Sequence, residues 1–274
     1  MRNPYFNFSQ FYHAVKTHTL TVKNNKIIKI IRIEEKFMSK KIVLKIGGSL
    51  LFDNEYNILQ EKIVKFAEII RDSEDIVAII IGGGKLARNF IEAGRHLGAS
   101  ESLCDTFGIE VSRLNARLLI TALKDLAYPE PITSLKDVRA FSLWNRILVA
   151  GGFIPGQSTT SVTFEIAESL HATDVIILTN VDGIYDKDPN KNPKAKKFDE
   201  ISILDLEKVI YGETGNSQSA AGEYRIFDAV SLQILKRSNI QVRLSNGEDF
   251  NTLRKLLVEK AFESNIGTKI LRNH

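Results

Sequence analysis

The segment Ile42-Val43-Leu44-Lys45-Ile46-Gly47-Gly48-Ser49-Leu50 decides the fold. Its first five residues are apolar except for one lysine, and two glycines end the run. Three more apolar runs follow at residues 76–81, 147–150 and 175–178. Continuous apolar runs are typical of strands that are covered on both faces, as in a parallel sheet. The pattern therefore predicts buried, parallel strands.

Helical periodicity lies between these runs. Apolar residues spaced near 3.6 predict one helix around residues 57–71 and another after residue 160, with Val162, Ile166 and Leu170 on one face. We also predict a helix near residues 203–211 and a second one with Phe227, Val230 and Ile234 on one face. A final helix follows Asp249, which could cap it. A strand at residues 241–245 precedes that last helix. This alternation predicts an α/β fold with helices on both sides of a mostly parallel sheet.

The composition is that of an ordinary globular protein. The chain has 274 residues, of which 43% are hydrophobic and 26% charged. No apolar run approaches the roughly 20 residues that a membrane span requires. The single cysteine, Cys104, excludes an intramolecular disulfide, so we expect a reducing, cytoplasmic location.

The basic pI of about 9.0 comes from the first part of the chain. Residues 1–37 hold seven Lys or Arg and two Asp or Glu, which leaves 30 basic and 31 acidic residues for residues 38–274. The nearly neutral body disfavours a nucleic-acid-binding face. We interpret residues 1–37 as a basic extension, either disordered or upstream of the true start at Met38, which is the only methionine besides Met1.

Glycine follows each of the first three predicted strands. The loops begin at Gly47-Gly48, Gly82-Gly83-Gly84 and Gly151-Gly152. In open α/β sheets, ligands bind beyond the carboxyl ends of the strands, where glycines let backbone N–H groups approach phosphate oxygens. Lys45 could carry its ammonium to the same edge, and Arg88 could also reach a phosphate.

Two familiar phosphate-binding motifs were tested against the second loop. The Walker pattern is absent, because Ile79 stands at its first glycine and Leu86 at its hydroxyl position. The dinucleotide pattern G-x-G-x-x-A does fit, with Asp105 as a candidate ribose ligand. However, residues 96–107 contain no strand-like run that would end in this acid, which disfavours an NAD-dependent oxidoreductase.

Six segments in order resemble the amino acid kinase superfamily, most closely the archaeal type of uridylate kinase. The similarity covers nearly all of residues 39–274. The segments are 45–49, 82–88, 108–116, 151–160, 179–189 and 219–222.

This resemblance implies ATP-dependent transfer of the γ-phosphoryl group to UMP, giving UDP for pyrimidine nucleotide (CTP) synthesis, with Mg²⁺ arriving as MgATP. It implies a three-layer αβα sandwich with a mostly parallel central sheet, formed as a single domain by residues 38–274. The N-terminal part would bind the acceptor and the C-terminal part ATP, in a homohexamer. The expected partners are ATP and UMP, with no nucleic acid and no membrane.

The resemblance also assigns site residues. Lys45 and Asp174 match catalytic positions, with Asp174 orienting the lysine. The matched ATP-binding positions are Gly48, Ser49, Gly84, Arg88, Thr179, Asn180, Tyr185 and Asp188. The matched UMP-binding positions are Gly83, Asp105, Phe153, Ile154, Pro155, Gly156, Gln157, Ser158 and Thr159. The scattered histidines and single cysteine suggest no resident metal.

One departure and two alternatives accompany this interpretation. Many relatives carry aspartate where this chain has Thr160, which concerns the fine geometry of the site. The fold also phosphorylates carboxylates, carbamate and isoprenoid phosphates, although isopentenyl phosphate kinases carry a histidine that is absent from residues 82–88. A non-catalytic nucleotide-binding protein is the second alternative, against which Lys45, Arg88 and Asp105 argue.

Overall fold

The computed structural model describes residues 40–187, 189, 192–211, 226–262 and 264–271. Their central feature is a seven-stranded sheet in the order β3-β2-β1-β4-β8-β9-β7. Its strands are β1 (Ile42–Ile46), β2 (Ile76–Ile81), β3 (Leu148–Ala150), β4 (Asp174–Thr179), β7 (Glu200–Ser202), β8 (Gln241–Asn246) and β9 (Thr268–Leu271). A separate hairpin pairs β5 (Ile184–Tyr185) with β6 (Lys197–Phe198).

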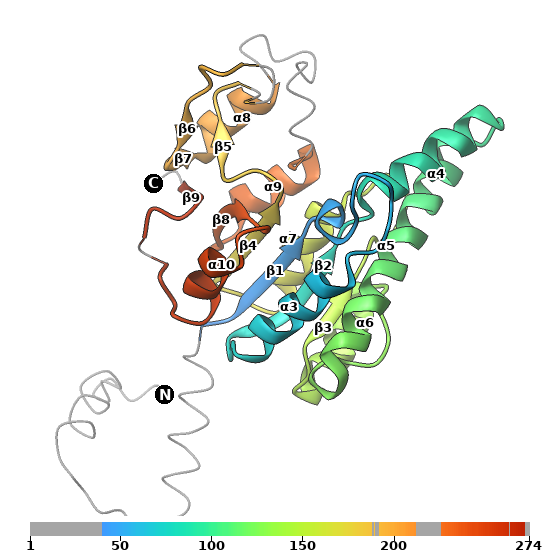
Figure 1. Ribbon diagram of the computed structural model, residues 1–274, viewed down its shortest axis with the longest axis horizontal. Helices are drawn as coiled ribbons and strands as arrows, with labels where there is room; N and C mark the ends of the chain where they lie inside the picture. The colour runs from blue at the N-terminus through green and yellow to red at the C-terminus, as the bar shows by residue number, and fades with distance from the viewer. Residues whose placement is uncertain (1–39, 188, 190–191, 212–225, 263, 272–274) are drawn as a thin grey trace, which may run out of the picture. The chain divides into compact units, whose positions relative to one another are not determined.

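The first five strands in the order, β3 to β8, are parallel, whereas β9 runs antiparallel to β8 and β7 runs parallel to β9. The chain lays β2 and β3 on one side of β1 and then returns to place β4 and β8 on the other (Figure 1). The order therefore reverses between β1 and β4. Such a switch point opens a crevice at the carboxyl ends of the strands, where ligands of open α/β sheets bind.

Helices cover both faces of the sheet. The described helices are α3 (Gln60–Arg71), α4 (Gly84–His96), α5 (Glu101–Leu123), α6 (Leu135–Phe141), α7 (Thr159–Ser169), α8 (Ile203–Tyr211), α9 (Ala229–Arg237) and α10 (Phe250–Leu257). Residues from α3, α5 and α10 form one core with Ile42, Leu44 and Ile46, whereas α6 to α9 form the other with Val43. The predicted three-layer αβα sandwich is confirmed.

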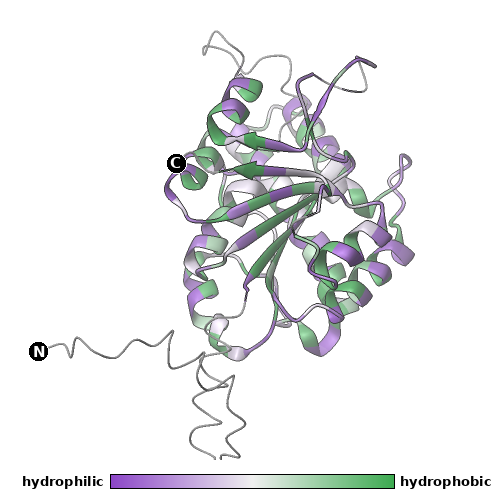
Figure 2. Cartoon of the chain, turned by 90° about the vertical axis from the view of Figure 1, so that its left-hand side faces the viewer, coloured by the Kyte–Doolittle hydropathy of each residue, from purple (hydrophilic) through white to green (hydrophobic). Residues whose placement is uncertain are grey.

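The strands are apolar because both of their faces are covered. All five residues of β1 are buried, and successive side chains enter opposite cores. Figure 2 shows the same arrangement, with mostly hydrophobic strands between helices that combine hydrophobic and hydrophilic residues. Continuous apolar runs are the expected pattern for such strands.

Two helix predictions need correction. The first helix begins at Gln60 and not near residue 57, because the Asp53 carboxylate accepts hydrogen bonds from the backbone N–H groups of Glu55 and Asn57 and forms a turn there. In α9, Val230 is 44% exposed and does not share the buried face of Ile234. Phe227 is buried but precedes the helix.

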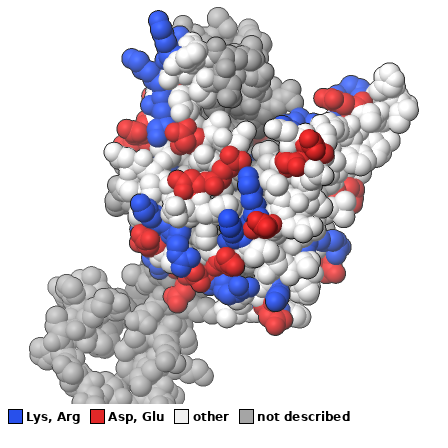
Figure 3. Space-filling model, in the orientation of Figure 1, with Lys and Arg blue, Asp and Glu red and all other residues white. Residues whose placement is uncertain are grey.

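Two surface observations complete the fold. None of the described helices is long and apolar enough to cross a membrane. On the face drawn in Figure 3, basic and acidic side chains are interspersed. The predictions for residues 1–37, including the start at Met38, lie outside the described residues.

Candidate functional site

The first two glycine loops touch each other through their backbones. A Cβ atom added at Gly48 would lie 2.2 Å from the carbonyl oxygen of Gly82, and one at Gly84 would lie 2.8 Å from the amide nitrogen of Ser49. Only glycine permits this approach. Gly47 N–H also donates to the carbonyl oxygen of Leu178 at the end of β4 (2.8 Å). The loops therefore meet at the switch point between β1 and β4.

Both loops lead into helical turns whose first amides have no side-chain cap. Gly47 precedes the 3-10 turn η1 (Gly48–Leu51), and Gly83 precedes α4. Serine or aspartate side chains cap α5, α6, α7, α9 and α10, whereas α3 also lacks a side-chain cap. Uncapped N-terminal amides carry partial positive charge and suit an anion such as phosphate.

Lys45 is a buried cation at this edge of the sheet and has no partner among the described residues. It is 9% exposed, and register places its side chain on the α7 face, level with Ile80 of β2 and Ile177 of β4. Burial lowers the pKa of Lys45 from 10.5 to about 8. Among the described residues, none forms a hydrogen bond or ion pair with its ammonium. Such a cation is costly unless an anion binds beside it.

The third loop reaches the same edge and is held by α5. A Cβ atom on Gly82 would lie 3.7 Å from the hydroxyl oxygen of Thr159, at the start of α7. Asp105 of α5 accepts a hydrogen bond from the backbone N–H of Gly156 (2.7 Å). The Arg113 guanidinium donates to the carbonyl oxygens of Gly152 (3.1 Å) and Phe153 (3.0 Å). The loop is thereby fixed although Ile154, Pro155 and Gly156 are exposed.

The remaining residues matched to UMP binding lie along the same stretch of backbone. Gly83 packs against Ala87, whose Cβ atom would lie 2.4 Å from an added Cβ. Ser158 caps α7 by accepting a hydrogen bond from Ser161 N–H (3.1 Å). Gln157 has a buried side-chain oxygen that no described residue contacts by a hydrogen bond. A buried acceptor of this kind suits a donor on a ligand.

The residues matched to ATP binding extend from the glycine loops to the β5–β6 hairpin. Ser49 lies in η1, and Arg88 lies exposed on the first turns of α4. Thr179 ends β4 and donates to the side chain of Asn180 (3.2 Å). The Tyr185 hydroxyl of β5 donates to Asp182 (2.6 Å), which raises the pKa of that hydroxyl to about 12. Asp188 lies outside the described residues.

The predicted role of Asp174 is wrong. Asp174 begins β4 and pairs in register with Ile42, three residues before Lys45 on β1, which is about 10 Å along a strand. Its carboxylate forms an ion pair with Lys40 (3.2 Å) and accepts from the Thr173 hydroxyl (2.6 Å). Because strand side chains alternate, Asp174 also faces the core opposite to Lys45.

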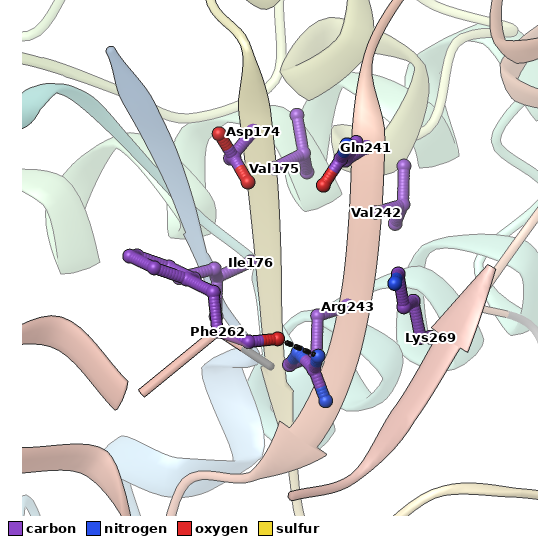
Figure 4. Close-up of a pocket in the computed structure, with 8 residues that line it drawn as sticks. All are labelled: Asp174, Val175, Ile176, Gln241, Val242, Arg243, Phe262 and Lys269. Atoms are coloured by element: carbon purple, nitrogen blue, oxygen red, sulfur yellow. Dashed lines mark hydrogen bonds between the residues drawn. The ribbon is translucent and has the colours of Figure 1, made fainter. Parts of the chain in front are cut away.

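Asp174 belongs instead to a shallow pocket at the amino end of β4 (Figure 4). The pocket is lined by β4, β8, β9 and Phe262. Arg243 of β8 donates to the carbonyl oxygens of Phe262, Ser264 (3.0 Å) and Ile266 (2.5 Å), and thereby holds the segment before β9. Lys40 lies 3.4 Å from the centre of the Phe262 ring.

Two buried polar residues of α5 also shape the site. The Asn115 side chain donates to the carbonyl oxygen of Gly82 (2.9 Å), and the Ser112 hydroxyl accepts from Gly152 N–H (2.8 Å). They are 2% and 1% exposed. Both lie in the matched segment 108–116, to which the resemblance assigns no site residue. Their spacing of three residues, which places two polar groups on one helix face, was the available indication.

Two other interpretations can now be judged. Asp105 lies within a helix and not at the end of a strand, so the dinucleotide-binding interpretation fails. Among the described residues, no group of three or more His, Cys, Asp or Glu side chains is arranged to hold a metal ion. The uncapped backbone amides of η1 and α4 and the buried Lys45 ammonium suit the binding of an anion.

Comparison with known proteins agrees with this geometry. The chain is 40% identical over 233 residues to a protein named uridylate kinase from Methanobrevibacter smithii. The aligned region covers 84% of this chain and 99% of that protein. It is 41% identical over 210 residues to a uridylate kinase of Methanocaldococcus jannaschii, covering 76% of this chain and 91% of that protein. The crystal structure of uridylate kinase from Archaeoglobus fulgidus superposes with a TM-score of 0.69 and 32% identity, covering 84% of this chain and all of that one.

These matches confirm the resemblance to archaeal uridylate kinases. A model of the amino acid kinase family matches residues 40–246. The chain belongs to the amino acid kinase family.

Proposed function

We propose that this protein transfers the γ-phosphoryl group of ATP to UMP, producing UDP for pyrimidine nucleotide synthesis. The observation that carries the proposal is the buried, unpaired ammonium of Lys45 beside two touching glycine loops. The identity of the acceptor is supported by the relatives named uridylate kinase, of which one is 40% identical over 233 residues.

Phosphoryl transfer requires alignment of two anionic substrates and neutralisation of charge on the transferred group. In our proposal, the Lys45 ammonium lies against the transferred phosphoryl group and stabilises its charge in the transition state. Backbone amides at Gly48, Ser49 and Gly84 bind the phosphates of ATP, with Arg88 beside them. Thr179, Asn180, Tyr185 and Asp188 hold the adenosine.

The acceptor nucleotide occupies the surface formed by Gly83, Asp105 and residues 153–159. Asp105 can accept hydrogen bonds from ribose hydroxyls, because a carboxylate is an acceptor only. Gln157 offers its buried oxygen to a donor on the nucleotide, which suits an N–H group of the base. The contact between Asp105 and Gly156 N–H would keep these groups on one surface.

Mg²⁺ would enter with ATP, and its chemistry is to neutralise phosphate charge. The exposed apolar residues Phe90 and Leu97 of the α4 segment and Leu103 and Leu114 of α5 support self-association, which we propose gives a homohexamer. We also propose that residues 38–274 act as one domain in the cytoplasm, with the acceptor bound by the N-terminal part and ATP by the C-terminal part.

A panel of acceptors tests the proposal. Purified protein is incubated with ATP, Mg²⁺ and either UMP, CMP, dUMP, isopentenyl phosphate or carbamate, and products are identified by mass spectrometry. We expect UDP to form fastest and an excess of EDTA to stop its formation. A higher kcat/KM for isopentenyl phosphate or carbamate would reassign the acceptor. Binding of nucleotides without any product would favour a non-catalytic role.

A further inference from the structure

Two hydroxyl groups in the first turn of α7 join this helix to a distant segment of the chain. The Ser161 hydroxyl donates to the Asp228 carboxylate, 2.7 Å from one oxygen and 2.9 Å from the other. The neighbouring Thr160 hydroxyl donates to the carbonyl oxygen of Ile226. Ser161 is fully buried and Thr160 is 2% exposed. We call these two contacts the α7–α9 clasp.

The carboxylate in the clasp already serves a second helix. Asp228 caps α9 by accepting from Ser231 N–H (2.6 Å), and the Ser231 hydroxyl accepts in turn from Asp228 N–H (2.8 Å). Burial opposes ionisation of Asp228, but hydrogen bonds from Ser158, Ser231 and Ser161 outweigh burial and lower its pKa. One negative charge therefore lies at the positive ends of α7 and α9.

The clasp leads directly to the loop that we assign to the acceptor. Ser161 N–H donates to the hydroxyl of Ser158, the last residue before α7. The hydroxyls of Ser158 and Ser161 lie 3.5 Å apart. A shift of Ser161 would thus be passed to residues 153–159. Asp105 and Arg113 hold the other part of this loop from α5, so the clasp supplies its attachment on the α7 side.

We propose that Ser161 and Asp228 are positioning residues that fix the acceptor loop, residues 153–159, in the form that binds UMP. This inference rests on the proposed function. It adds a contribution from the segment before α9 to acceptor binding, although the loop itself precedes α7.

Thr160 supports the same inference. In this chain the residue is a hydrogen-bond donor to the carbonyl oxygen of Ile226. An ionised aspartate at this position would accept hydrogen bonds only and could not make that contact. The threonine therefore strengthens the connection between α7 and the segment before α9.

Two matched serine variants test the proposal. Ser161→Ala removes the contact between helices but leaves the carboxylate free to cap α9. Ser231→Ala also removes a fully buried hydroxyl bonded to Asp228, but it leaves the clasp intact. Isothermal titration with UMP and, separately, with ATP gives the affinities, urea denaturation gives stability, and a coupled UDP assay gives KM for each substrate.

We expect Ser161→Ala to raise the Kd and KM for UMP about tenfold, which corresponds to ~1.4 kcal/mol, and to leave ATP binding unchanged. Ser231→Ala should lower stability by a similar amount and leave the Kd for UMP within about twofold of the wild type. Equal UMP affinities for the two variants would overturn the positioning role. If the wild-type protein itself did not bind UMP, the proposed function would fail and the positioning role with it.

Discussion

The two ends of the central strands differ in whether their buried charged groups have a partner of opposite charge. At the carboxyl end, the Lys45 ammonium is buried, and no described residue pairs with it. At the amino end, each of the two buried carboxylates has a lysine beside it. Asp174 pairs with Lys40 (3.2 Å), and Asp75 pairs with Lys260 (2.8 Å). At the amino edge these two carboxylates each have a lysine, whereas the carboxyl edge has a cation that needs an anion.

The backbone polar groups of the two edges differ in the same way. Glycines bring the loops at the carboxyl edge into contact and leave the amides of η1 and α4 without side-chain caps. At the amino edge, the Arg243 guanidinium satisfies three carbonyl groups of the segment before β9. An unsatisfied charge therefore identifies a functional edge better than charge alone does.

Substitution of Lys45 should have the largest effect on activity. We expect Lys45→Ala to lower turnover at least a hundredfold, because one well-placed transition-state donor contributes ~2.7 kcal/mol or more. A coupled UDP assay measures the loss. Lys40→Ala, which removes one of the two paired lysines of the amino edge, should change turnover less than about threefold, as expected for a partly exposed ion pair. Similar losses in both variants would remove the distinction between the two edges.

The same lysine should make stability depend on pH. Burial lowers the pKa of Lys45 from 10.5 to about 8, so below pH 8 the folded state carries the whole cost of burying the charge. Between these values the folded protein releases the proton while the unfolded chain retains it, and the free energy of unfolding should rise by ~3 kcal/mol. Urea denaturation from pH 7 to 11 measures this as a difference from Lys45→Met, which cancels other groups. A difference that stays constant with pH would contradict a buried, unpaired ammonium.

Close contact of the glycine loops can be tested with one methyl group. Gly48→Ala would place a Cβ atom 2.2 Å from the carbonyl oxygen of Gly82, so the loops must separate. We expect turnover to fall at least tenfold and stability to fall by ~1–3 kcal/mol. Gly98→Ala is the control, because its φ of +84° strains alanine by ~1 kcal/mol but no other atom lies within 4 Å. Undiminished turnover in Gly48→Ala would show that the contact is unimportant.

Asp174→Asn should affect stability and not catalysis. The substitution removes the charge that pairs with Lys40, and we expect the free energy of unfolding to fall by ~1–2 kcal/mol. Turnover should stay within about twofold of the wild type. Urea denaturation and the UDP assay separate the two effects. Loss of turnover at unchanged stability would return Asp174 to the catalytic role that its position in the sheet contradicts.

Much of the fold could be predicted because its central strands are buried on both faces. The apolar runs at residues 42–46 and 76–81 coincide with β1 and β2, and Asp249 caps α10 as predicted. The long helix α5 was not predicted. It buries Ser112 and Asn115, whose polar groups bind the glycine loops and obscure the apolar face of the helix. The short strands β5, β6 and β7 have two or three residues each and carry no periodic pattern.

The sequence predicted the position of the loops that follow strands, but it misplaced Asp174, which begins a strand. Glycines after parallel strands gather at one edge, which placed the three loops correctly. Asp174 precedes its strand and therefore lies at the opposite edge. Because Asp174 comes before the rest of β4 in the sequence, its position could have excluded it from the site. Asp228 could not have been found in this way, because its contact with Ser161 joins residues 67 positions apart.

The position of β1 between β2 and β4 has a consequence for biosynthesis. Ile42 pairs with Asp174, so roughly 130 residues must leave the ribosome between the two partners. Translation at about 5–20 residues per second imposes a delay of roughly 7 to 26 seconds on this pairing. Until then the Lys45 strand has one free flank, and a nascent chain halted before β4 would present it to solvent or to a chaperone.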